Sequence, residues 1–110
     1  MTLARVALLC PDLLFGSRVE GALRAAGHEV TRYDSEHATE ADAVVVDLTA
    51  DGIDAAAVAR DADGVPTIGF YPHVDVETRR RALDAGYDVV VPRSKMARET
   101  AAVVEGALAA

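Results

Sequence analysis

The chain has 110 residues, a formal net charge of −7 and one cysteine, a length that suits one domain over residues 1–110 without metal or disulfide staples. The acidic balance argues against a nucleic-acid binder, which must neutralise phosphates with Lys and Arg, and no apolar run approaches the ~20 residues of a membrane span. Because the first residues also lack the pattern of a signal peptide, we expect a cytoplasmic protein without an internal disulfide.

The first part of the chain predicts strand, helix and strand in turn. A buried-strand pattern covers residues 3–9. Apolar residues then recur at helical spacing over 15–26, where Asp12 suits the N-cap and Gly27 the end of the helix. The segment 29–33 is shorter than the first strand pattern and includes an arginine, which is typical of a strand at the edge of a sheet.

An uninterrupted run of valines marks the centre of the predicted sheet. Residues 34–42 carry acids but no apolar stripe, so we expect a loop or one helical turn there. The β-branched run 44–46 then suits a strand covered on both faces, and it ends at the carboxylate of Asp47. An alanine-rich segment over 53–60 predicts a short helix.

Strands and helices continue to alternate in the second half of the chain. Residues 67–71 predict a fourth strand, and residues 76–85 a helix with Asp75 as its N-cap. A fifth strand covers 89–91, after which Ser94 suits the N-cap of a last helix. One face of that helix carries Met96, Thr100, Val103, Val104 and Ala107.

This alternation predicts an α/β fold, a three-layer doubly wound parallel sheet with the flavodoxin-like strand order 2-1-3-4-5. The carboxyl ends of parallel strands meet at one edge, where ligands bind in such folds. The chain has neither a G-x-G-x-x-G nor a G-x-x-x-x-G-K phosphate loop, and one cysteine with dispersed histidines makes no zinc cluster. The residues expected at that edge are Cys10, Pro11, Asp12, Asp47, Tyr71, Pro72, His73, Pro92, Arg93 and Ser94.

Four segments of the chain together carry a family resemblance: 44–47 (VVVD), 66–71 (PTIGFY), 82–87 (ALDAGY) and 89–94 (VVVPRS). With these segments the chain resembles, over nearly its whole length, the CheY-like receiver domain of bacterial response regulators. In that family an aspartate at the end of the third strand accepts a phosphoryl group from a histidine kinase. The resemblance therefore implies that Asp47 stands at the phosphoacceptor position.

Several positions depart from the pattern of that family. The acidic pair that holds magnesium falls on Cys10 and Pro11, which leaves Asp12 one position later. The switch Ser or Thr falls on Tyr71, and the lysine of the fifth strand falls on Arg93. The connections around the third strand are also short, so the second and third helices of the family should be shortened here.

The resemblance and its departures together imply a stand-alone signalling and protein-interaction module, a pseudo-receiver that is not an enzyme and works without phosphorylation or a cofactor. Asp47 would then pair with Arg93 or cap the following turn, and Asp12 would serve as an N-cap. The alternative is a working phosphoacceptor of a two-component system with magnesium held by Asp12 and Asp47. A third possibility is a small enzyme that uses Cys10, His73 and Asp47.

Charge is distributed unevenly along the chain. Residues 34–63 hold nine acids against one arginine, and residues 64–98 hold four acids against five arginines and one lysine. The acidic stretch is interpreted as a solvated surface. In receivers the fourth helix, fifth strand and fifth helix form the usual partner face, so we expect a protein partner or a second copy, and no nucleic acid or membrane, at Arg79, Arg80, Arg81 and Arg98.

Overall fold

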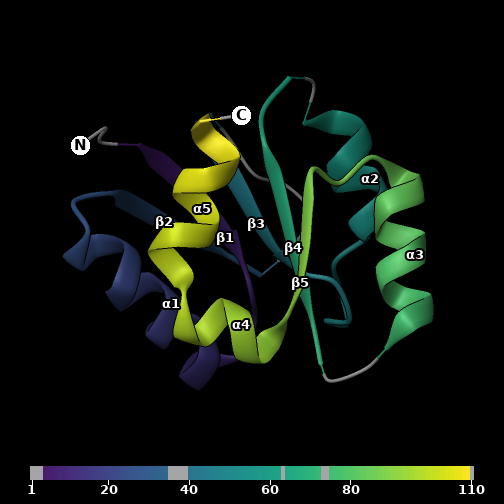
Figure 1. Ribbon diagram of the computed structural model, residues 1–110, viewed down its shortest axis with the longest axis horizontal. Coiled ribbons are helices and arrows are strands. Elements are labelled where there is room, and N and C mark those ends of the chain that lie inside the picture. The colour runs from purple at the N-terminus through teal and green to yellow at the C-terminus, as the bar shows by residue number, and fades with distance from the viewer. Residues whose placement is uncertain (1–3, 35–39, 63, 73–74, 110) are drawn as a thin grey trace.

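The computed structural model describes residues 4–34, 40–62, 64–72 and 75–109. Within these residues five parallel strands form one sheet in the order β2-β1-β3-β4-β5, which confirms the predicted order 2-1-3-4-5 (Figure 1). The strands are β1 (Arg5–Leu9), β2 (Glu29–Tyr33), β3 (Ala43–Asp47), β4 (Thr67–Tyr71) and β5 (Val89–Pro92).

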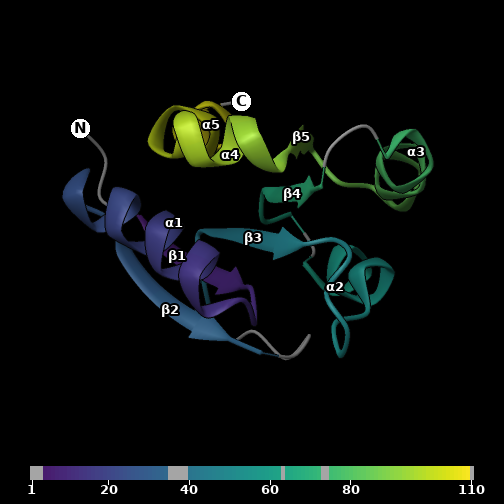
Figure 2. The same ribbon diagram turned by 90° about the horizontal axis from the view of Figure 1, so that it is seen from below.

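Helices cover both faces of this sheet, so the fold has the three layers that were predicted (Figure 2). The helices are α1 (Leu13–Ala25), α2 (Ala55–Asp61), α3 (Val76–Ala85), α4 (Arg93–Arg98) and α5 (Thr100–Ala109). On one face α1 packs with α4 and α5, and on the other α2 packs with α3. None of the helices in the described ranges has the length and apolar character needed to cross a membrane.

The core consists of two layers of side chains, one on each face of the sheet. Val6 and Leu8 of β1 lie in the layer beneath α1 and α5. Ala7 and Leu9 lie in the opposite layer, with residues of α2 and α3. Successive side chains of a strand point to opposite faces, so a strand covered on both faces needs an apolar residue at every position. The valines of β3 divide between the two layers in the same way.

Carboxylate caps begin three of the helices. Asp12 accepts a hydrogen bond from the Phe15 N–H at 3.0 Å, and Asp75 accepts one from Thr78 at 3.1 Å, as predicted. Asp54 caps α2 in the same way, so that helix begins two residues later than the alanine-rich segment suggested. Gly86, with φ of 106°, ends α3 in the left-handed conformation that favours glycine.

The prediction for the end of the chain was wrong in two respects. Pro92, with φ of −67° and ψ of 152°, occupies the cap position, so Ser94 already lies inside α4 and does not cap it. The helix is also broken at Glu99, after which Thr100 donates its hydroxyl to the carbonyl of Met96. The expected inward face survives the break because its buried residues are Met96, Thr100, Val104 and Ala107, with Val103 partly buried beside them.

The predicted shortening applies to the connections on both sides of β3. The helix after β3, α2, has seven residues, which confirms that this helix of the fold is trimmed. Between β2 and β3, residues 34 and 40–42 are not helical. The rest of that connection, 35–39, lies outside the described residues, so the shortened second helix remains a prediction there.

A buried histidine joins the start of β1 to α5. The side chain of His28 is fully buried, and its Nδ1 accepts a hydrogen bond from the Ala4 N–H at 3.1 Å. Its Nε2 therefore carries the proton and donates to Glu105 at 2.8 Å. The link connects residues 77 positions apart, and it gives the Ala4 N–H, just before β1, a hydrogen-bond acceptor.

Leu8→Ala should lower the free energy of unfolding by about 2–5 kcal/mol, because removal of a fully buried side chain leaves a cavity under α1. Leu14, 87% exposed on α1, offers the matched control, and Leu14→Ala should change the same quantity by less than about 0.5 kcal/mol. Urea denaturation followed by circular dichroism measures both. Equal losses in the two variants would contradict the placement of Leu8 in the core.

Candidate functional site

Asp47 ends β3 at the carboxyl edge of the sheet. Its side chain is buried, with the residue only 4% exposed. β3 lies between β1 and β4, and Asp47 is in register with Phe70 of β4. The Asp47 carboxylate is therefore buried at the carboxyl end of a central strand, where an unpaired charge is costly.

Both carboxylate oxygens of Asp47 have partners. Oδ2 lies 3.3 Å from a terminal nitrogen of Arg93. Oδ1 accepts a hydrogen bond from the Thr49 N–H at 3.3 Å and faces the Thr49 hydroxyl at 3.5 Å, which is long for a hydroxyl donor. The expected pair with Arg93 and the expected cap of the following turn are therefore both present.

Arg93 is the centre of the site. A terminal nitrogen of its guanidinium lies 3.6 Å from Oδ2 of Asp12. The guanidinium also lies over the ring of Phe15, 4.5 Å from the centroid, with the ring of Phe70 at 5.9 Å. These distances suit cation–π attraction, and the two rings pack on each other at 5.0 Å. Two carboxylates and two rings thus hold one cation.

The sequence did not single out Phe15 or Phe70 as site residues. Both belong to apolar patterns that predict core positions, and both do pack in the core layer beneath α1. The register of β3 and β4 sets Phe70 beside Asp47, but that register is known only from the paired strands, and no sequence signal marked Phe15.

Asp12 serves two neighbours at once. Its Oδ1 caps α1, which confirms the N-cap prediction, and its Oδ2 faces Arg93. A magnesium ion between Asp12 and Asp47 would have to displace the guanidinium that lies between their carboxylates. Among the described residues no group of three His, Cys, Asp or Glu side chains is placed to hold a metal ion. These residues therefore do not fit magnesium as they stand.

The thiol of Cys10 is buried against the same carboxylate. Its Sγ lies 4.0 Å from Oδ2 of Asp47. Burial, followed by the charge of Asp47, raises the pKa of the Cys10 thiol above its usual value. A raised pKa works against the thiolate that the enzyme alternative requires. His73, the third residue of that alternative, lies outside the described residues.

Burial also raises the pKa of the Asp47 carboxyl, although the Thr49 N–H and Arg93 act in the opposite direction. The direction of this pKa shift decides whether the charged Asp47 carboxylate stabilises the fold. A carboxyl whose pKa is higher in the folded protein than in the unfolded chain opposes folding as pH rises through that window. The charged form of Asp47 is therefore tolerated because of its partners and does not itself stabilise the fold.

Arg32 of β2 binds the turn between β1 and α1 that carries Asp12. One of its terminal nitrogens donates to the carbonyls of Cys10 and Asp12, at 3.0 and 3.2 Å. Gly16 of α1 leaves room for it, because a β-carbon at that position would overlap the guanidinium. The arginine that marked β2 as an edge strand in the sequence therefore also orders the turn that carries Asp12.

Tyr71 is buried, with 7% of the residue exposed. Its neighbour Phe70 faces Arg93, and successive side chains of a strand point to opposite faces. Among the described residues no hydrogen bond joins the Tyr71 hydroxyl to Asp47 or to Arg93. A functional role for Tyr71 remains a prediction.

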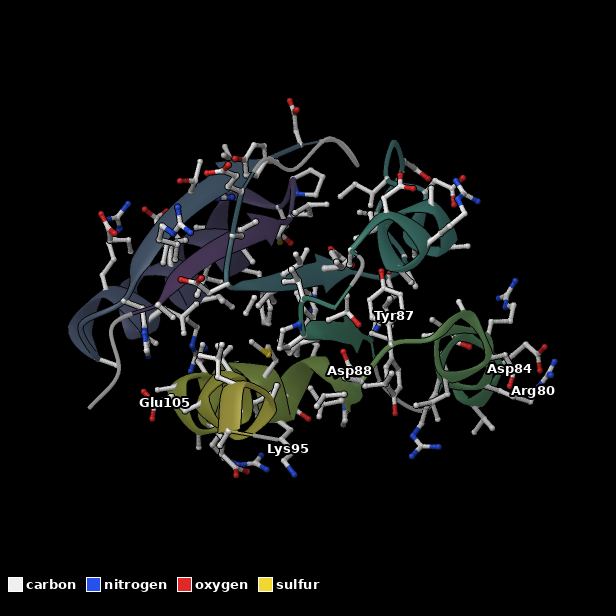
Figure 3. All side chains as sticks on the ribbon, turned by 90° about the horizontal axis from the view of Figure 1, so that it is seen from above. Arg80, Asp84, Tyr87, Asp88, Lys95 and Glu105 are labelled. Atoms are coloured by element: carbon white, nitrogen blue, oxygen red, sulfur yellow. The ribbon has the colours of Figure 1, made fainter. Side chains whose placement is uncertain are left out.

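The arginines of the predicted partner face lie apart from Asp47. Arg79, Arg80 and Arg81 are exposed on α3, and Arg98 is exposed at the end of α4. Figures 1 and 2 place α3, β5, α4 and α5 along one side of the molecule. Figure 3 shows Arg80 directed away from the body, where it pairs with Asp84 of its own helix.

Comparisons with known proteins support the fold through structure alone. No family model matches the chain, and no curated protein sequence matches it. A receiver-domain protein (CheY-like) from Methanospirillum hungatei superposes with a TM-score of 0.84 at 14% identity, over 98% of this chain and 95% of that one. The receiver domain of the sensor histidine kinase PA1611 from Pseudomonas aeruginosa gives 0.83 at 16% identity, over 99% and 100%.

Longer proteins match over one part of their length. NtrX from Brucella abortus superposes with a TM-score of 0.87 at 17% identity, over 98% of this chain but 28% of the NtrX chain. The PA1611 structure is described with a magnesium ion in its active-site cleft, a property of that protein. The strand order, the three layers and these superpositions together show that the chain has the fold of a CheY-like response-regulator receiver domain.

Proposed function

We propose that this chain is a cytoplasmic signalling module that acts by binding another protein or a second copy of itself, without phosphorylation of Asp47 and without catalysis. The receiver fold supports the general class. The observation that carries the finer statement is the contact between Arg93 and Asp47 at 3.3 Å.

Transfer of a phosphoryl group to a carboxylate needs an accessible oxygen and cations that offset the charge of the phosphoryl oxygens. Here Asp47 is only 4% exposed, and both of its oxygens are engaged. The cation beside it is an arginine fixed by Asp12 and Phe15, in place of a free lysine and a metal. Phosphorylation would have to break a mostly buried pair, which favours a module that works without it.

Incubation with magnesium and acetyl phosphate should leave the mass of the protein unchanged, because Arg93 already occupies the carboxylate of Asp47. Mass spectrometry of the intact chain measures this, and Asp47→Asn is the control for labelling at other positions. Addition of magnesium with beryllofluoride should likewise leave the NMR spectrum unchanged near Asp47.

A phosphoryl mass gain in the natural chain that Asp47→Asn abolishes would overturn this proposal. It would instead support the second candidate, a phosphoacceptor that holds magnesium through Asp12 and Asp47. Binding of magnesium with beryllofluoride at Asp47 would have the same meaning.

The pair should also be measurable as a coupling between its two residues. Arg93→Ala should lower the free energy of unfolding by about 1–3 kcal/mol, since it leaves Asp47 buried without its cation, while the 35% exposure of the Arg93 side chain moderates the loss. In the background of Asp47→Asn the same substitution should cost less. Urea denaturation of the four proteins gives the coupling free energy, with Arg18→Ala on α1 as an exposed control. Additive effects would show that the pair does not stabilise the edge of the sheet.

The partner face offers a separate test. Combined substitution of Arg79, Arg80, Arg81 and Arg98 by Ala should weaken self-association or a partner complex by about 10-fold, because these side chains are exposed on α3 and α4 and would bring positive charge to an interface. Sedimentation equilibrium over a concentration series measures self-association. Arg60→Ala on α2 is the control for loss of one exposed arginine elsewhere. If every complex and the oligomeric state stay unchanged, this face is not the interface.

A further inference from the structure

A cavity of about 320 Å³ lies between α2 and α3, on the opposite face of the sheet from Arg93. Alanines of both helices line it: Ala55 and Ala56 from α2, and Ala82 and Ala85 from α3. Small side chains at facing positions keep the two helices from filling the space between them, whereas packed interiors normally leave few voids larger than a water molecule. The opening therefore follows from the alanine-rich composition of these helices.

Two larger residues complete the walls of the cavity. Leu48 lies over Gly69 of β4, where a β-carbon would stand 2.7 Å from the leucine side chain, so glycine at that position lets Leu48 pack flat against the sheet. Tyr87 is 4% exposed, and its hydroxyl donates to the carbonyl of Ala55 at 2.9 Å. Figure 3 shows the Tyr87 side chain reaching toward α2.

The cavity has one cationic side chain at its wall. Arg81 carries the one charge among the described residues that line it, and no carboxylate in the described ranges lies within ion-pair distance of its guanidinium. Asp75 and Glu77 are near enough for the charge of Arg81 to help lower the pKa of each carboxyl, but hydrogen bonds from other residues lower these pKa values more. Asp75 accepts hydrogen bonds from Thr78 at 3.1 and 2.7 Å, Glu77 pairs within α3, and Asp54 caps α2.

We propose that this cavity binds a small monocarboxylate with an apolar body, the body lying among the alanines and the carboxylate meeting Arg81. A volume of about 320 Å³ is at the lower end of the range for small-molecule pockets, so the ligand is small. An arginine favours a carboxylate over a neutral or cationic group, since its planar donors match the two oxygens.

The cavity and Asp47 share one residue. Thr49 lines the cavity and donates its N–H to Oδ1 of Asp47 at 3.3 Å. A ligand that moves Thr49 therefore changes a hydrogen bond to the buried carboxylate. α3 also carries Arg79, Arg80 and Arg81 of the partner face, so a ligand that contacts Arg81 would regulate binding there. That consequence rests on the proposed function, whereas binding of the ligand does not.

Titration of the ¹⁵N-labelled full chain with hexanoate, hexanamide and hexylamine tests the proposal. These probes share an apolar body and differ in charge. Hexanoate should shift the amide resonances of Thr49, Ala56 and Ala82 and bind about 10-fold more tightly than hexylamine, with hexanamide between them. Equal binding of all three, or no localised shifts, would overturn the proposal.

Variants at the cavity test its empty volume and the charge of Arg81 separately. Ala82→Leu should fill the cavity and abolish the hexanoate shift at Thr49, whereas Ala102→Leu, on the exposed face of α5, should retain it. Arg81→Gln should weaken hexanoate about 10-fold and leave hexanamide unchanged. Ala56→Leu, at an exposed position that also lines the cavity, replaces Ala82→Leu if that protein does not fold. Unchanged hexanoate affinity in a folded cavity-filling variant would overturn the proposal, and this result is independent of any partner complex.

Discussion

The carboxyl edge of the sheet depends on the contact between Arg93 and Asp47. A carboxylate that is 4% exposed needs a partner, and this one has a guanidinium at 3.3 Å and a backbone N–H at the turn that follows. The same guanidinium meets Asp12 at the start of α1 and lies over Phe15. One side chain thus ties the end of β3 to α1 and to the start of α4. At this edge both oxygens of Asp47 are thus engaged by groups of the protein itself.

The two faces of the sheet have different packing. Beneath α1, α4 and α5 the core is filled by large side chains, such as Phe70 and Leu23, that are fully buried. Between α2 and α3 alanines leave the cavity described above. Thr49 connects the two faces because it follows Asp47 in the chain and lines that cavity. The closely packed side and the side with the cavity therefore meet at the turn that follows Asp47.

Local patterns predicted most of the elements because each depends on residues close in the chain. The valines before Asp47 indicated a central strand, and Asp12 and Asp75 marked the starts of two helices. The break at Glu99 was not predictable from periodicity, since the apolar face continues across it. The same holds for His28, whose partners come from distant segments and whose neighbours in the sequence give no sign of burial.

The sequence by itself determined the parallel sheet, its strand order and the position of Asp47 at the carboxyl edge of the sheet. The spacing of apolar residues and the right-handed connections between parallel strands leave few other arrangements. The resemblance had implied its pair with Arg93, 46 positions later, but only the tertiary structure decided what else surrounds that carboxylate. The register of β3 and β4 sets Phe70 beside it, and the packing of α4 on α1 brings Phe15 to the same guanidinium. Strand alternation sets Tyr71 away from it, and the facing alanines of α2 and α3 open the cavity. These outcomes depend on how distant segments pack, which no local pattern contains.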